Sequence, residues 1–144
     1  MILGISTSLS QFSVSLHNKL DLIYCNQAER ALHGQSDIHE LVTTTLEKTT
    51  TSIRDITSIV VDIGPGGTSS VRTGVSFANA LSYSLNVPIR GVSSAELMGI
   101  DSFKKHKKPT AVLFKSIKGN YFCGIYTGAH LDFLYADLDA IRTH

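Results

Sequence analysis

The 144-residue chain has no tryptophan, two methionines, two cysteines and three prolines. Its 13 lysines and arginines nearly balance 12 aspartates and glutamates, which argues against an acidic disordered tail and against a surface coated in basic charge for nucleic acid. No apolar run approaches the roughly 20 residues that span a bilayer, so no membrane association is expected. Cys25 and Cys123 lie far apart in the sequence and predict two reduced, buried thiols instead of a disulfide framework.

The start of the chain does not resemble a secretion signal. Residues 1–6 have no basic segment and turn polar within a few positions, whereas a signal peptide needs a basic start and a longer apolar stretch. We therefore expect a cytoplasmic protein. The chain is long enough for one hydrophobic core, so we expect one domain, or one domain and part of a second.

Alternating side chains predict strands in the first part of the chain. Residues 12–17 alternate between apolar and polar, the period of a half-buried strand. With the apolar runs 2–5 and 20–25 on either side, and a tight turn at Asn18-Lys19, they predict a three-stranded antiparallel meander.

A helix is predicted over residues 37–51, because apolar side chains recur there at helical spacing. Asp37 and Glu40 have the layout of a capping box at its start. Further along, Ser69 or Ser70 caps a second helix that runs to residue 85. Ser93 is the predicted cap of a third helix, which ends in the basic cluster 104–108. The remaining strand candidates are residues 59–63, 89–92, 110–114 and 120–126, with a last apolar run near Phe133.

This order of elements indicates an α/β layer fold, in which helices flank a mixed sheet. Three strands are followed by helix, strand, helix, strand, helix and a final β-hairpin. The composition breaks at residues 104–109, where lysines and a proline cluster. We therefore expect a first domain over residues 1–103 and part of a second domain over residues 109–144.

A glycine-rich turn follows the 59–63 strand and is the most informative motif. Gly64, Pro65, Gly66 and Gly67 stand between a buried strand and a helix, where free backbone N–H groups can hold a phosphate or a carboxylate. The spacing matches neither the dinucleotide-binding fingerprint nor the P-loop, and Pro65 removes one donor. A structural turn and an anion site both stay open from these residues.

The helix after this turn has unusually small side chains. Gly74 lies within it, and a helical glycine costs about 1 kcal/mol, so we expect a close contact there as compensation. One interpretation is packing on the protein's own sheet. The alternative is that the other face meets a partner, with Val71 and Phe77 as anchors.

Residues 64–74, Gly-Pro-Gly-Gly-Thr-Ser-Ser-Val-Arg-Thr-Gly, resemble the G-P-G-S-F-T-G-L-R-x-G signature of the TsaB (YeaZ) proteins. Residues 3–7 resemble the L-x-I-x-T first strand of that family, and residues 88–94 resemble its P-x-x-G-V-S-T/S segment. The resemblance covers residues 2–100 and continues weakly to residue 126. It implies the actin/Hsp70-like ATPase fold, which is ribonuclease H-like, without that fold's catalysis.

The resemblance also implies a function. TsaB proteins pair with a catalytic homologue, TsaD, and work with an ATPase, TsaE. Together these proteins attach threonylcarbamoyl to the adenosine beside the anticodon of certain tRNAs. The chain is therefore expected to be a non-catalytic subunit that meets TsaE through the complex and tRNA only indirectly. No cofactor is expected on the chain alone, and the binding of ATP or ADP at the partner interface stays open.

In the TsaB family, two helices of the first domain contact TsaD or a second TsaB copy. Carried over to residues 37–51 and 70–85, this implies an interface formed by Ile38, Leu41, Val42, Thr45, Val71, Arg72, Val75 and Phe77. The chain departs from the signature at residues 67–70, and Ser6 stands where the family commonly has aspartate. The second domain begins only shortly before residue 144, so we expect a shortened, divergent member.

Other interpretations stay open. One is a homodimeric structural or regulatory protein of the same fold. Another is a small nucleotide- or anion-binding enzyme that uses the Gly64–Gly67 turn. No metal site is expected, because His33 and His39 are six residues apart and do not share a helical face. The basic cluster Lys104–Lys108 indicates a solvated helix end, with contact to tRNA phosphates as the alternative.

Overall fold

The computed structural model describes residues 1–29 and 38–143 of the chain. It divides into two compact units, Met1–Val92 and Ser93–His144. The sequence placed this division at residues 104–109, later than the structure does. The difference arises because the helix that ends in the basic cluster packs on strands of the second unit.

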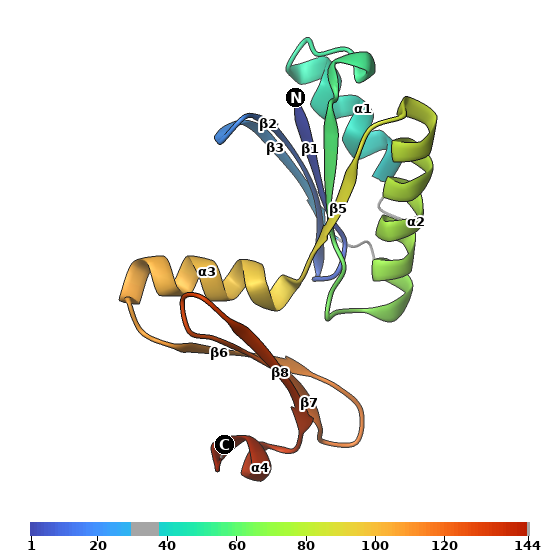
Figure 1. The fold of residues 1–144 in the computed structure, drawn as a ribbon. Coiled ribbons are helices and arrows are strands. Elements are labelled where there is room, and N and C mark those ends of the chain that lie inside the picture. Colours follow the sequence, from blue (N-terminus) through green and yellow to red (C-terminus); the bar gives the residue numbers. More distant parts are fainter. Residues whose placement is uncertain (30–37, 144) are drawn as a thin grey trace. The chain divides into compact units, whose positions relative to one another are not determined.

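The first unit follows the predicted order of strands and helices. Its elements are β1 (Ile2–Ser6), β2 (Gln11–Asn18), β3 (Asp21–Glu29), α1 (Ile38–Lys48), the 3₁₀ helix η1 (Ile53–Asp55), β4 (Ser58–Asp62), α2 (Thr68–Leu85) and β5 (Ile89–Val92). Among the described residues, they form a five-stranded sheet in the order β3-β2-β1-β4-β5 (Figure 1). The antiparallel pairs β1–β2 and β2–β3 confirm the predicted meander. The pairs β1–β4 and β4–β5 are parallel, so the sheet is mixed.

The core of the first unit lies between one face of this sheet and the helices α1 and α2, which lie on the same side of it (Figure 1). Leu3 stands between Leu16 of β2 and Ile59 of β4 in the strand register, so apolar residues of three strands share one face. Each such side chain contributes about 1.5–3 kcal/mol when it is fully buried. The buried apolar residues are Leu3, Ile5, Phe12, Val14, Leu16, Ile38, Leu41, Val42, Ile56, Ile59, Val61 and Ala78.

Both predicted helices of the first unit change their bounds. The first spans Ile38–Lys48 instead of 37–51. Asp37, its predicted cap, lies outside the described residues. Beyond the helix, Thr50 has a φ of 52°, in the left-handed region, which ends the helical path. The second helix begins at Thr68, with Gly67 at the cap position and no side-chain cap bond. Ser69 and Ser70 therefore lie inside the helix.

The second unit is a small sheet with a helix packed on it. Its elements are α3 (Ser94–His106), β6 (Thr110–Lys115), β7 (Tyr121–Tyr126), β8 (Leu131–Ala136) and α4 (Leu138–Arg142). Ser93 caps α3 as predicted, because its hydroxyl accepts a hydrogen bond from the Ala95 N–H. The strands pair antiparallel in the order β6-β7-β8, and β8 is the predicted apolar run near Phe133. α3 packs on β6 and β7.

The two cysteines differ in exposure. Cys123 is buried in β7, and burial raises the pKa of its thiol. Cys25 is exposed on β3, an edge strand, so the prediction of a buried thiol is wrong there. Neither cysteine forms a disulfide. Within the described parts of the chain, no helix is long and apolar enough to cross a membrane.

Candidate functional site

The signature turn is anchored by a buried carboxylate at the end of β4. Asp62 is only 4% exposed. Its Oδ1 accepts a hydrogen bond from the Gly64 N–H at 2.9 Å. Its Oδ2 accepts one from the Ser6 hydroxyl at 2.8 Å and a short one from the Ser8 hydroxyl. One side chain therefore ties the end of β1 to the start of the turn.

The glycines of the turn allow the backbone to approach the segment after β1. A Cβ on Gly66 would collide with the backbone carbonyl of Ser8. The Gly67 N–H donates a hydrogen bond to the same carbonyl oxygen at 3.1 Å. Gly64 has a φ of 88°, which favours glycine, and it precedes a cis peptide bond to Pro65. The turn is therefore built for packing against residues 6–8.

This geometry favours one of the two interpretations of the turn. The N–H groups of Gly64 and Gly67 are used by Asp62 and Ser8, and Pro65 has none. The Asp62 carboxylate also lies at the start of the turn, where its negative charge repels an anion at short range. The arrangement favours a structural turn over a phosphate site.

The first turns of α2 pack closely on the segment that follows β1. The Thr7 hydroxyl donates a hydrogen bond to the Ser70 carbonyl oxygen at 2.7 Å. One helical turn later, a Cβ on Gly74 would collide with the Thr7 hydroxyl and lie 3.1 Å from its methyl carbon. The close contact predicted at Gly74 is therefore present, and it is made with the protein's own sheet side.

The structure corrects the predicted interface residues of α1. Ile38, Leu41, Val42 and Thr45 are at most 7% exposed and lie in or beside the core. The family resemblance implied a partner contact here, but these residues form the face of α1 that packs on the sheet, so they are not available to a partner. The exposed side of α1 is polar and includes Glu40 and Thr43.

The predicted interface residues of α2 differ in how far they are buried. Val75 and Phe77 are partly buried and pack against the core. Val71 is half-buried, and its methyl carbon lies 3.4 Å from the position a Cβ on Gly64 would take. Arg72 alone of the four is fully on the exposed side. Most of the predicted contact residues are thus parts of the fold of the first unit.

A different set of α2 residues faces outward, and we call it the outer face of α2. Tyr83 is its largest apolar side chain and is 90% exposed. The sequence contained a usable signal, because the buried Ser70, Gly74 and Ala78 recur every four residues and the exposed set lies opposite them. The outer face consists of Ser69, Arg72, Thr73, Ser76, Ala80 and Tyr83.

The two histidines considered as metal ligands do not form a site among the described residues. His33 lies outside the described residues, and His39 is exposed on α1. Across residues 1–29 and 38–143, no group of three or more His, Cys, Asp or Glu side chains is placed to hold a metal ion.

Comparison with protein families identifies the chain's relatives. A family model described as "TsaD: tRNA N6-adenosine threonylcarbamoyltransferase" matches residues 26–128, which is more than half of the chain. The chain belongs to the TsaD family. The signature turn and both α1 and α2 lie within the matched residues.

Two curated relatives illustrate the breadth of the match. A "tRNA threonylcarbamoyladenosine biosynthesis protein TsaB" from Buchnera aphidicola subsp. Schizaphis graminum is 26% identical over 127 residues, covering 88% of this chain and 60% of that protein. A "tRNA N6-adenosine threonylcarbamoyltransferase" from Clostridium kluyveri is 30% identical over 98 residues, covering 68% of this chain and 26% of the enzyme. The chain therefore spans 60% of the length of the TsaB relative and 26% of the length of the transferase.

A solved structure of YeaZ from Pseudomonas aeruginosa has the same fold. It matches with a TM-score of 0.78 at 18% identity, over 94% of this chain and 65% of that one. The resemblance to TsaB (YeaZ) proteins and the predicted actin/Hsp70-like fold are thereby confirmed for this member of the TsaD family.

Proposed function

We propose that the chain is a partner subunit in tRNA threonylcarbamoyladenosine biosynthesis, and that it holds a TsaD-like catalytic protein through the outer face of α2. Membership of the TsaD family and the curated TsaB relatives support the pathway. A TsaE-like ATPase would meet the chain through that complex. ATP or ADP at the interface stays a prediction.

The observation that carries this proposal is the exposure of Tyr83. It is 90% exposed on an 18-residue helix that packs on its own sheet through the opposite side. Buried tyrosines often dominate the binding energy of protein interfaces. The neighbouring outer residues Ser76 and Ala80 are small, so a helix of a partner can approach the backbone closely. The outer face suits helix-to-helix pairing.

Two residues support a non-catalytic role. Phosphoryl transfer on this type of fold relies on carboxylates that hold magnesium. Ser6 ends β1 with a hydroxyl instead of a carboxylate. Asp62, the carboxylate at the end of β4, is buried and accepts hydrogen bonds from three donors of the protein itself. The subunit would therefore position its catalytic homologue and leave the chemistry to it.

Co-purification with the TsaD of the same organism, followed by mass determination of the complex, tests this function. We expect a stoichiometric complex, with and without added ADP or ATP. Tyr83→Asp should weaken it about 30-fold or more, the loss expected when an interface anchor is removed. Leu20→Asp is the matched control, because Leu20 is 97% exposed in the turn between β2 and β3.

Each outcome separates the alternatives. A homodimer that ignores TsaD would support the structural or regulatory interpretation and contradict the proposed role. If Tyr83→Asp and Leu20→Asp weakened pairing equally, the outer face of α2 would not be the contact surface for TsaD. Because both side chains are exposed, neither variant should lose its fold, and circular dichroism checks this directly.

A further inference from the structure

The second unit carries a concentrated basic surface at the end of α3. Lys104, Lys105, His106, Lys107 and Lys108 are all exposed and follow one another in the sequence; we call them the basic turn. Residues 93–144 contain seven lysines and arginines against five aspartates and glutamates, and four of those seven cations lie in the basic turn. Residues 1–92 have six against seven.

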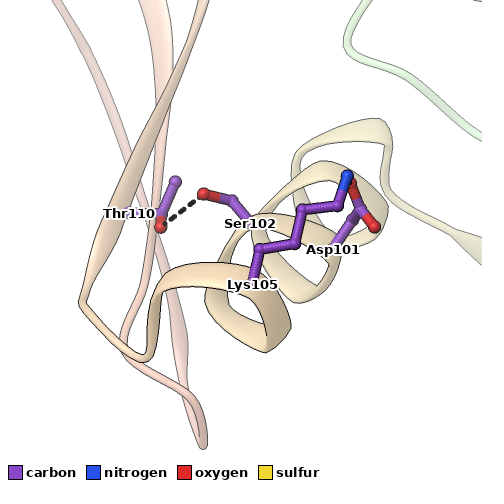
Figure 2. A network of polar contacts seen from close by, with 4 residues as sticks. All are labelled: Asp101, Ser102, Lys105 and Thr110. Carbon is purple, nitrogen blue, oxygen red and sulfur yellow. Dashed lines mark hydrogen bonds and ion pairs between the residues drawn. The ribbon is translucent and has the colours of Figure 1, made fainter.

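One lysine of the basic turn, Lys105, forms an ion pair within the protein. The Lys105 ammonium lies 2.7 Å from a carboxylate oxygen of Asp101, one helical turn earlier (Figure 2). Lys104, Lys107 and Lys108 form no ion pair within the part of the chain that the structure describes. Three exposed ammonium groups are therefore available to an external anion.

The backbone beneath these lysines is held in place. Lys107 has a φ of 54°, and its N–H donates a hydrogen bond to the Phe103 carbonyl oxygen at 2.8 Å. The Thr110 hydroxyl bonds to the Ser102 hydroxyl at 3.1 Å (Figure 2) and to the Lys108 carbonyl oxygen at 3.2 Å. These bonds tie the start of β6 back to α3 and fix the direction in which the turn leaves the helix.

Complementing the helix dipole does not account for this cluster. That effect is confined to the last helical turn, where Lys104, Lys105 and His106 lie. Lys107 and Lys108 come after the last helical residue, His106. The positive charge therefore continues past the end of the helix onto a fixed turn. Such an extended row of cations suits a polyanion, which carries its negative charges along a chain.

We propose that the basic turn binds the phosphate backbone of tRNA directly, which is the alternative that the sequence left open for Lys104–Lys108. The choice of tRNA as the polyanion rests on the proposed function. Lysine ammonium groups act as flexible point charges and position a nucleic acid without reading its sequence. The contact would hold the substrate against the modification complex without selecting the base.

Salt-dependent binding tests this contact on the full chain alone. The probe is a fluorescently labelled, unmodified tRNA transcript, with anisotropy measured over a series of salt concentrations. The variant combines Lys104→Gln, Lys107→Asn and Lys108→Gln, where asparagine tolerates the positive φ of residue 107. The logarithm of the association constant falls linearly with the logarithm of the salt concentration. Each lost phosphate contact makes this negative slope shallower by about 0.7–0.9, so the variant's slope should be shallower than the wild-type slope by about 2–3.

The matched control combines Lys48→Gln, Lys115→Gln and Lys118→Asn. It removes the same charge from three exposed lysines, and Lys118 shares the positive φ of Lys107, at 56°. We expect this control to keep the wild-type slope. Absence of tRNA binding by the wild-type chain at low salt, an unchanged slope in the basic-turn variant, or an equal loss in the control would each overturn the proposal.

The same titration with polyglutamate separates an acidic protein partner from RNA. If the basic-turn variant lost polyglutamate binding but kept wild-type tRNA binding, the assignment of RNA as the ligand would be overturned. These results are independent of pairing with TsaD. A chain that pairs with TsaD and does not bind tRNA overturns only the basic-turn proposal, and the reverse result overturns only the pairing.

Discussion

Thr7 and Gly74 touch across the interface between the first sheet and α2. The buried Thr7 side chain fills the space where Gly74 has no Cβ, and its hydroxyl donates a hydrogen bond to the Ser70 carbonyl oxygen at 2.7 Å. Together with the bonds of Asp62, this contact places the signature turn and the start of α2 against the end of β1.

Replacing Gly74 with alanine should destabilise the first unit, although alanine is the better helix former. The new methyl group would collide with Thr7, and overpacking typically costs about 1–3 kcal/mol. Urea unfolding measures the loss. Ser76→Ala, on the outer face of α2, serves as the control and should change stability by less than about 0.5 kcal/mol. Adding Thr7→Ala makes room, so the double variant should lose less than the sum of the two single changes.

Asp62→Asn should destabilise the chain while nearly preserving the shape of the side chain. The neutral amide replaces the Asp62 carboxylate, which accepts hydrogen bonds from Ser6, Ser8 and the Gly64 N–H. A hydrogen bond to a charged group contributes about 1.5–3 kcal/mol to stability. We expect a loss of about 2 kcal/mol or more in urea unfolding, and a smaller loss for Ser6→Ala, which removes one donor. Asp21→Asn, at an exposed position, is the control. Equal effects at Asp21 and Asp62 would contradict the anchoring role of Asp62.

Leu41→Asp should unfold the first unit or nearly so. Leu41 is 7% exposed in the core, and a buried, unpaired carboxylate is strongly unfavourable. Thr43→Asp introduces the same charge on the exposed side of α1 and should leave the circular dichroism spectrum unchanged. A folded Leu41→Asp protein would mean that this face of α1 is not packed on the sheet and would restore Leu41 as a contact candidate.

The two thiols should react at very different rates with a disulfide reagent. Cys25 is exposed and Cys123 is buried, and burial raises the pKa of the Cys123 thiol, which lowers the fraction of reactive thiolate. In folded Cys25→Ser protein we expect slow labelling that becomes complete in denaturant. Fast labelling of that variant would show that Cys123 is accessible in the native state.

Cys123 should also make stability depend on pH. Because the folded pKa of its thiol is raised, the folded state holds the proton more tightly than the unfolded state. This contribution is fully present below the unfolded thiol pKa and is lost as the pH rises through the folded pKa. The stability difference between wild type and Cys123→Ala, from urea unfolding under reducing conditions, should therefore shrink over that range. A constant difference would contradict a raised pKa.

Much of the local structure could be predicted from residue patterns. Period-two alternation in residues 12–17 predicted β2, and the serine at position 93 predicted the start of α3. The start of α2 was missed by a few residues, because Gly67 and not a serine occupies the cap position. A serine is a good cap only where its hydroxyl can reach a free N–H group, and that depends on how the chain enters the helix.

By itself, the sequence determined the order of elements, the meander, the signature turn and the family resemblance, because these depend on short-range patterns and on motifs read along the chain. Only the tertiary structure decided which faces are free. The periodicity of α1 is the same whether Leu41 meets its own sheet or a partner, and only packing selects the sheet. The assignment of α3 to the second unit likewise depends on contacts between residues far apart in the sequence, which local patterns do not contain.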